Sequence, residues 1–238
     1  MSEILKIIQD RHSSRFPFDR EHPPSKQDLV QVLEAARWAP TAHNMQNFEI
    51  IVVDDKKQLE ELGSIESKIS EEFLSENYQQ LSFSEEELLQ KKVGILGTMF
   101  PQSWRTPDDW GKIARESEPS SLDQTIKCSP MLLIVTYDAR KRAPASEGDV
   151  LGLISLGCVM ENMWLMAQAL GIDFQIMSVF SADSVERDVK KILEIPEYMR
   201  IAYAVRLGYP IKSAKFLRVR RDIGGFSHHN RFGNKLLV

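Results

Sequence analysis

The spacing of apolar residues predicts two helices near the start of the chain. Residues 3–10 (EILKIIQD) have the pattern of a short amphipathic helix. Residues 25–38 form a stronger pattern, in which four apolar residues fall on one face: Leu29, Val32, Leu33 and Ala36. Ser25 and Asp28 give a capping signal at the start of this second helix, and Pro40 stops it.

Strands and further helices follow in the rest of the chain. Four segments rich in β-branched residues predict strands: 48–53 (FEIIVV), 131–138 (MLLIVTYD), 174–179 and 201–209 (IAYAVRLGY). Residues 149–170 are apolar around nearly the whole circumference, which predicts a buried central helix or one covered by another subunit. Gly171 supplies its C-terminal cap. We expect Asp183 to cap a helix through Leu193 that ends at Pro196.

The middle of the chain is more polar. Residues 56–97 predict short helical pieces, with a break near Gly63 and a second capping signal at Ser84 and Glu87. Residues 98–121 are irregular and contain Trp104 and Trp110, which are equally consistent with a lid over a flat ligand and with anchors that pin a loop to the core. We therefore expect one α+β domain, 1–238, with a helical and loop insertion at about 64–121 that forms a possible lid.

Composition and charge argue against several classes of protein. The chain has a net charge of −4, which argues against nonspecific nucleic-acid binding. Residues 211–238 nevertheless carry seven bases and one acid, so a local anionic ligand or an acidic partner fits that region, as does a solvated tail. The apolar run at 131–135 is too short to span a membrane, and no signal peptide is predicted. Cys128 and Cys158 lack CxxC spacing, which favours the cytoplasm.

Familiar catalytic motifs are missing from the sequence. It contains no GxGxxG, phosphate-loop, GxSxG or HExxH signature. We expect no metal site, because the adjacent His228 and His229 would point to opposite faces of a strand. Two polar segments remain. Arg11 and Arg15 in DRHSSRF are able to bind an anion or simply to complement a helix dipole. The amides of the 41–47 loop are able to form hydrogen bonds with a heterocycle or to satisfy a turn.

Four segments together resemble the nitroreductase family of FMN flavoproteins. They are RHSSRF (11–16), VLEAARWAP (32–40) with its following polar loop and strand, MENMWLMAQALGIDF (160–174), and ILEIPEYMRIAYAVRLGYP (192–210) with the later LRVRRD (217–222). The resemblance covers about 1–55 and 128–230. It implies a mixed, mainly antiparallel sheet flanked by helices, in an intertwined homodimer with FMN at the interface.

The resemblance also implies which residues hold FMN. Arg11, His12 and Ser13 correspond to contacts with the phosphate and ribityl chain, and Arg15 to a place near the pyrimidine edge. Asn44 and Gln46 correspond to contacts with the ring or the ribityl hydroxyls. The remaining expected contacts are with the flavin near N5 and with the phosphate: Met177, Ser178, Arg218 and Arg220.

The implied function is an oxidoreductase that passes a hydride from NADH or NADPH through FMN to a nitroaromatic, quinone or similar small molecule. Because FMN carries the hydride chemistry, the missing catalytic residues are expected. Reductive dehalogenation or flavin modification, and noncatalytic flavin binding, are the alternatives. Two departures from the family pattern stand out: Asn47-Phe48 replaces Pro-Trp, and Ser178 replaces a glycine whose backbone N–H faces flavin N5.

Overall fold

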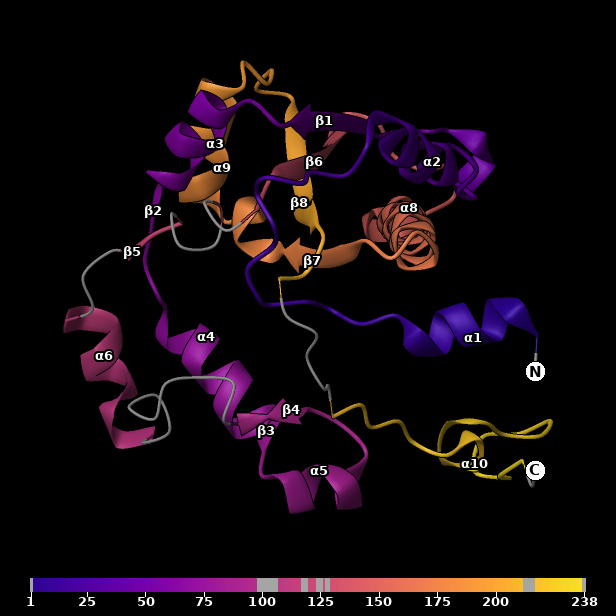
Figure 1. The fold of residues 1–238 in the computed structure, drawn as a ribbon. Coiled ribbons are helices and arrows are strands. Elements are labelled where there is room, and N and C mark those ends of the chain that lie inside the picture. Colours follow the sequence, from indigo (N-terminus) through magenta and orange to yellow (C-terminus); the bar gives the residue numbers. More distant parts are fainter. Residues whose placement is uncertain are drawn as a thin grey trace. The chain divides into compact units, whose positions relative to one another are not determined.

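The computed structural model describes residues 2–97, 107–116, 120–122, 126, 129–211 and 217–236 (Figure 1). The chain forms two compact units. The first contains Met1–Ser67 and Ser120–Ser213, and the second contains Lys68–Pro119 and Ala214–Val238. The second unit thus includes nearly all of the range predicted as an insertion, together with the C-terminal segment.

An antiparallel sheet in the order β1-β6-β8-β7 is the centre of the first unit. Its strands are β1 (Glu49–Val53), β6 (Met131–Asp138), β7 (Asp173–Met177) and β8 (Met199–Gly208). Beside β7, Ser13 forms a parallel bridge with Phe174, which gives the sheet its mixed character. The predicted strands and the α+β class are confirmed. A smaller pair, β2 (Glu66–Ser67) and β5 (Ser120–Ser121), also belongs to this unit.

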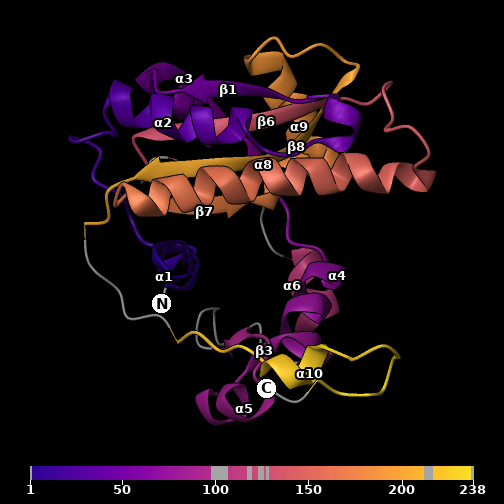
Figure 2. The same cartoon turned by 90° about the vertical axis from the view of Figure 1, so that its right-hand side faces the viewer.

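Helices cover both faces of this sheet. On one face α2 (Lys26–Arg37) and α8 (Val150–Ala169) pack against alternate sheet residues such as Leu133 and Val205 (Figure 2). On the other face α3 (Lys56–Gly63) and α9 (Asp183–Ile192) enclose a second cluster. That cluster includes Leu132, Ile134 and Ala204. The two-residue period of the strands therefore builds two apolar layers from one sheet.

Local capping explains where the helices begin and end. Helix α1 (Glu3–Asp10) and α2 begin at Ser2 and Ser25, whose hydroxyls accept backbone N–H groups as predicted for Ser25. Gly171, with φ +70°, follows α8, and the Ile172 N–H donates to the Ala167 carbonyl at 2.9 Å. This is the Schellman arrangement that a glycine favours.

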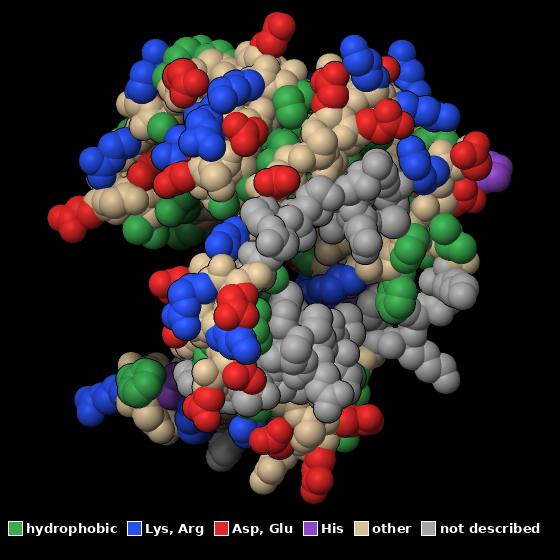
Figure 3. Space-filling view, turned by 90° about the vertical axis from the view of Figure 1, so that its left-hand side faces the viewer, with side chains coloured by type: hydrophobic (Ala, Val, Ile, Leu, Met, Phe, Trp, Pro, Cys, Tyr) green, Lys and Arg blue, Asp and Glu red, His purple; other side chains and the backbone are tan. Residues whose placement is uncertain are grey.

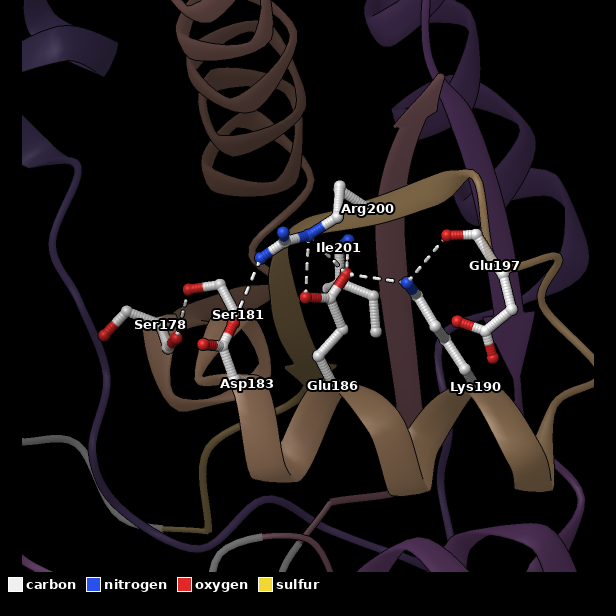
Figure 4. A network of polar contacts seen from close by, with 8 residues as sticks. All are labelled: Ser178, Ser181, Asp183, Glu186, Lys190, Glu197, Arg200 and Ile201. Atoms are coloured by element: carbon white, nitrogen blue, oxygen red, sulfur yellow. Dashed lines mark hydrogen bonds and ion pairs between the residues drawn. The ribbon is translucent and has the colours of Figure 1, made fainter. Parts of the chain in front are cut away.

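The predicted capping role of Asp183 is wrong. Ala182 occupies the N-cap of α9 without a side-chain cap, and Asp183 is the first helical residue. The Asp183 carboxylate instead forms an ion pair with Arg200 at 3.3 Å (Figure 4). The helix also ends at Ile192, before the predicted Leu193.

A buried carboxylate joins α9 to β8. Glu186 accepts a hydrogen bond from the backbone N–H of Ile201 at 2.8 Å and lies 3.3 Å from Lys190 Nζ (Figure 4). The register of β6 and β8 shifts at this point, so Ala202 is an extra residue in β8. A bulge interrupts the ladder of backbone hydrogen bonds, and Glu186 provides an acceptor at that place.

The second unit consists of short elements around its own apolar residues. Leu74, Leu88 and Trp110 are buried there. The elements are α4 (Glu71–Ser75), η2 (Glu76–Gln80), β3 (Ser82–Phe83), α5 (Glu85–Lys91), β4 (Ile95–Leu96), η5 (Pro107–Asp109), α6 (Trp110–Glu116) and α10 (Ile223–Phe226). Ser84 and Glu87 form the predicted capping box. The buried Trp110 supports the anchor interpretation, whereas Trp104 lies outside the described residues.

Charges are interspersed on the outer surface of the α3 and α9 face (Figure 3). Lys57 and Glu61 form an exposed pair on α3, and Lys191 pairs with Asp188 on α9. Such exposed pairs contribute little to stability. This face therefore has the features of a solvated surface.

Candidate functional site

The segment that follows α1 is fixed against α8 and β7. The indole Nε1 of Trp164 donates to the His12 carbonyl at 3.0 Å, and the Ser14 N–H donates to the Phe174 carbonyl at 3.1 Å. Trp164 also stacks on Phe174, with ring centroids 5.1 Å apart. The main chain of residues 12–14 is therefore held by elements more than 150 residues away in the sequence.

Arg11 and His12 of this segment have acidic neighbours. Arg11 lies 3.3 Å from Glu161 and places its guanidinium 4.3 Å from the centre of the Trp164 ring. His12 Nε2 lies 3.6 Å from Asp173. The segment thus holds donors suited to an anion, and Glu161 partly neutralises the strongest of them.

The side chains of this segment differ in burial. Ser13 is half-buried, and Arg15 is exposed. Ser14 is only 1% exposed, and its Oγ has no hydrogen-bond partner among the residues that the structure describes. A buried hydroxyl without a partner is unfavourable unless a bound group supplies one. The structure thus makes Ser14 a candidate beside Ser13.

Arg206 is a buried residue that sequence reasoning missed. It lies near the C-terminal end of β8 and is 2% exposed. Its Nη2 donates to the Phe16 carbonyl at 3.2 Å and to Gln175 Oε1, and the guanidinium lies 4.7 Å from the Phe18 ring. Arg206 therefore ties the segment after Arg15 to the sheet. A lone arginine inside an apolar strand pattern was the available signal.

The polar loop of residues 41–47 has an unusual backbone. His43, Asn44 and Gln46 have φ values of 50°, 54° and 48°. This left-handed region is unfavourable for residues other than glycine, and among those asparagine tolerates it best. The Asn44 and Gln46 side chains are exposed, and Gln46 Nε2 donates to Asn44 Oδ1 at 3.0 Å. Clustered strain of this kind is common at functional sites.

Side chains from other elements fix this loop. Asn47 Nδ2 donates to the Asp138 carbonyl, and Asn47 Oδ1 accepts from the Asp138 N–H, both at 3.1 Å. The Ala42 N–H donates to Ser155 Oγ of α8 at 2.9 Å. Two hydrogen bonds from Arg140 at 2.9 Å lower the pKa of the Asp138 carboxyl to about 2. Beside the loop lies a cavity of about 430 Å³, lined in part by Gln46, Arg140 and Tyr198.

The other predicted residues lie in two different places. Met177 is buried at the end of β7, and Ser178 is exposed directly after it. Ser181 Oγ donates to the Ser178 carbonyl at 2.7 Å, which fixes this turn (Figure 4). Arg218 and Arg220 are exposed residues of the second unit. The first unit thus carries the Arg11–Arg15, Asn44–Gln46 and Met177–Ser178 groups, and the late basic pair belongs to the second.

Histidine and acidic side chains do not gather into a metal site in the described part of the chain. His228 stacks on Phe232 with ring centroids 4.5 Å apart, and its Nδ1 accepts the Gly233 N–H at 3.0 Å. His229 donates its backbone N–H to the Asn234 carbonyl at 2.7 Å. These contacts assign both residues to the folding of the C-terminal hairpin.

The sequence profile of the nitroreductase family matches residues 8–209. The chain belongs to the nitroreductase family. A relative from Archaeoglobus fulgidus, described as an NADH dehydrogenase/NAD(P)H nitroreductase, is 26% identical over 210 residues, which cover 88% of this chain and 87% of the relative. The match includes the Arg11, Asn44 and Ser178 groups but ends before Arg218.

Solved structures share the nitroreductase fold. A nitroreductase with bound FMN from Bacteroides fragilis has a TM-score of 0.58 and 22% identity, over 97% of this chain and 100% of that one. An NADH dehydrogenase/NAD(P)H nitroreductase from Bacteroides thetaiotaomicron has a TM-score of 0.63 and 14% identity, over 98% and 99%. An FMN-dependent nitroreductase from Clostridium difficile has a TM-score of 0.60 and 16% identity, over 96% and 99%.

These findings confirm the predicted family, fold class and enzyme class, and the relatives are described as FMN-dependent or as NAD(P)H nitroreductases. The residues present also fit FMN chemically. The Arg11 guanidinium suits a phosphate, and the Ser14 Oγ, which has no partner among the described residues, suits a hydroxyl or phosphate oxygen. The exposed amides of Asn44 and Gln46 suit a ring with alternating C=O and N–H groups. The individual contacts remain predictions.

Proposed function

We propose that this nitroreductase-family chain transfers a hydride from NADH or NADPH, through bound FMN, to a nitroaromatic, a quinone or a similar small acceptor. The observation that carries the proposal is the backbone-fixed Arg11–Ser14 segment, with its cation and its partnerless buried hydroxyl, inside the range that matches the family. FMN supplies the hydride chemistry when it is bound. The protein supplies binding, orientation and electrostatics.

The residues of the chain divide this work. Arg11, His12 and Ser13 hold the phosphate and the ribityl chain. Arg15 lies near the pyrimidine edge of the flavin. Contacts to the ring come from the amide side chains and the turn after β7: Asn44, Gln46, Met177 and Ser178. The Ser178 backbone N–H faces flavin N5, and the Ser181 hydroxyl holds that turn through the Ser178 carbonyl.

A second copy of the chain completes the assembly in this proposal. The N-terminal half of α8 presents Val150, Leu153 and Ile154, each 55% exposed, and α1 presents Ile4 at 69%. By length and composition alone, Glu147–Ala169 would pass for a membrane span. Its C-terminal half is committed to the core of the first unit, with Val159 and Met163 fully buried. We therefore assign the open apolar face to a homodimer in the cytoplasm, with FMN at the interface beside Arg11.

The proposal is tested by reconstitution. The purified chain should bind one FMN and oxidise NADH or NADPH when a nitroaromatic or quinone is present. Arg11→Ala should weaken FMN binding by about ten- to a hundredfold, the range of a charge-assisted hydrogen bond. Arg187→Ala removes an exposed arginine of α9 and serves as the matched control. Equal FMN affinity of both variants would contradict the role of Arg11.

The homodimer has its own test. Leu153→Asp together with Ile154→Asp should convert a dimer into a monomer, measured by light scattering after gel filtration, because two charges would enter an apolar interface. Val30→Asp, at a residue of α2 that is 54% exposed, provides the control. A monomeric wild-type protein would contradict the assembly.

A further inference from the structure

We propose that Asn47 is a positioning residue of this site, whose amide holds the strained 41–46 backbone in the conformation that presents Asn44 and Gln46 to the flavin. The inference rests on the proposed function and extends it to a residue with no assigned role. It also explains why a polar amide stands where the family resemblance led us to expect proline.

The position of Asn47 in the sheet register is the first argument. In the β1–β6 ladder, Glu49 pairs with Thr136. Two residues further along each strand, the next pair would join Asn47 to Asp138. The backbone of Asn47 does not make that pair, and the chain turns here, with the Phe48 N–H donating to the Gln46 carbonyl at 2.9 Å. The Asn47 side chain makes both bonds instead, one to the Asp138 carbonyl and one from its N–H, each at 3.1 Å.

A side chain with a donor and an acceptor is required for this pair. Asp138 offers one backbone acceptor and one backbone donor, and a single amide group satisfies both. Alanine would leave both Asp138 groups without these partners, and aspartate would place an oxygen against the Asp138 carbonyl. The amide thus extends the sheet by one pair while the main chain turns away from strand geometry.

The strain in the loop gives this pair its importance. His43, Asn44 and Gln46 all have positive φ values. Such backbone persists only where surrounding contacts hold it. On the N-terminal side the Thr41 hydroxyl accepts the Gln46 N–H at 3.1 Å, and Ser155 accepts the Ala42 N–H at 2.9 Å. On the C-terminal side Asn47 supplies the two hydrogen bonds to Asp138.

The partner of Asn47 is itself rigid. The Asp138 carboxylate accepts two hydrogen bonds from the Arg140 side chain and one from the Arg140 N–H at 3.0 Å. Arg140 also stacks on Tyr198, with its guanidinium 3.6 Å from the ring centre. The Asn47 amide therefore connects the loop to a fixed point at the end of β6.

The test compares two asparagines. Asn47→Ala removes the pair with Asp138, whereas the control Asn162→Ala removes one hydrogen bond from α8 to the Ala35 carbonyl, at 3.0 Å. Backbone hydrogen exchange of the FMN-free proteins measures the loop directly. Asn47→Ala should accelerate exchange at Asn44 and Gln46 by about tenfold or more, and Asn162→Ala should leave both amides unchanged. Wild-type exchange rates at these amides in Asn47→Ala would overturn the inference.

FMN binding provides the second measurement. Asn47→Ala should weaken FMN binding by about tenfold and alter the visible circular dichroism of the flavin, while Asn162→Ala preserves both. Unchanged affinity and spectrum in Asn47→Ala would reject the positioning role. If Asn47→Ala does not fold, Asn47→Asp gives the same readouts, because it keeps the acceptor for the Asp138 N–H. A wild-type protein that binds no FMN would instead overturn the proposed function, while the exchange result still decides whether Asn47 holds the loop.

Discussion

Two predicted flavin-binding segments of the first unit are stabilised in different ways. Segment 11–16 is held by partners that come from distant elements: Trp164, Glu161, Phe174 and Arg206. Loop 41–47 also has distant partners, Ser155 and Asp138, near its two ends, but its own backbone is bent by three residues with positive φ. The first segment should therefore respond to changes in the core, and the second also to changes in its own backbone.

The difference also concerns charge. In segment 11–16 Glu161 lies beside Arg11, so the proposed FMN phosphate competes with Glu161 for this guanidinium. In loop 41–47 the exposed groups that we assign to FMN are neutral amides, so shape and hydrogen-bond direction decide binding. Substitutions should separate these two contributions.

The largest effect is expected from Arg206→Ala. It removes a buried guanidinium and leaves the Phe16 carbonyl and Gln175 without their donor. The free energy of unfolding, measured by urea denaturation, should fall by about 3–5 kcal/mol. Arg187→Ala, an exposed arginine of α9, should change it by less than about 0.5 kcal/mol. A loss below about 1 kcal/mol in Arg206→Ala would show that this arginine does not anchor the segment.

Trp164→Phe should have the next largest effect. It keeps an aromatic ring over Phe174 and removes the donor to the His12 carbonyl. We expect a loss of about 1–2 kcal/mol in the free energy of unfolding, together with weaker FMN binding. Trp38 also donates through Nε1, to Glu34 at 2.7 Å, but is 73% exposed. Trp38→Phe should therefore be nearly neutral, and an equal loss in both variants would count against the anchoring role of Trp164.

Glu161→Gln should strengthen FMN binding. The substitution removes the carboxylate 3.3 Å from Arg11 and leaves the guanidinium free to pair with a phosphate. Because the pair is partly exposed, we expect only about a two- to fivefold gain in affinity, which shrinks as salt is added. Fluorescence titration of FMN measures it. Weaker binding would mean that Glu161 orients Arg11 rather than competing with FMN.

The smallest effect on stability is expected from Gln46→Gly. Glycine adopts a φ of 48° without strain, so the free energy of unfolding should rise by up to about 1 kcal/mol although the proposed contact to the flavin is removed. Lys92, the left-handed C-cap of α5, provides the control because it lies in the second unit. Lys92→Gly should stabilise similarly and leave FMN binding unchanged. If Gln46→Gly also leaves FMN binding unchanged, Gln46 does not contact the cofactor.

Local patterns made much of the fold predictable. Helices 3–10 and 25–38 carry their own caps, and the strands follow from β-branched runs, so each element is determined by neighbouring residues. The prediction at Asp183 was wrong by one position, because the helix begins at this residue with Ala182 as its N-cap. When no side chain caps the N-terminus of a helix, the sequence predicts its first residue less accurately.

The site was predictable only in part. The motif residues Arg11, Asn44 and Gln46 were identified through the family resemblance. The residues that hold these segments, Glu161, Arg206 and Asn47, contact partners 91 to 190 residues away in the sequence, and some of those partners are backbone atoms. No local sequence pattern indicates such pairs. Positive φ at a glutamine is also invisible in sequence, because the residue type disfavours it.

Anaerobic reduction of the reconstituted protein tests the central claim most directly. After loading with FMN and removal of free cofactor, the chain should retain one FMN, and NADH or NADPH should bleach the visible absorbance of the flavin. A nitroaromatic or a quinone should then restore that absorbance. A protein that retains no FMN, or whose bound FMN neither NADH nor NADPH reduces, would contradict the account.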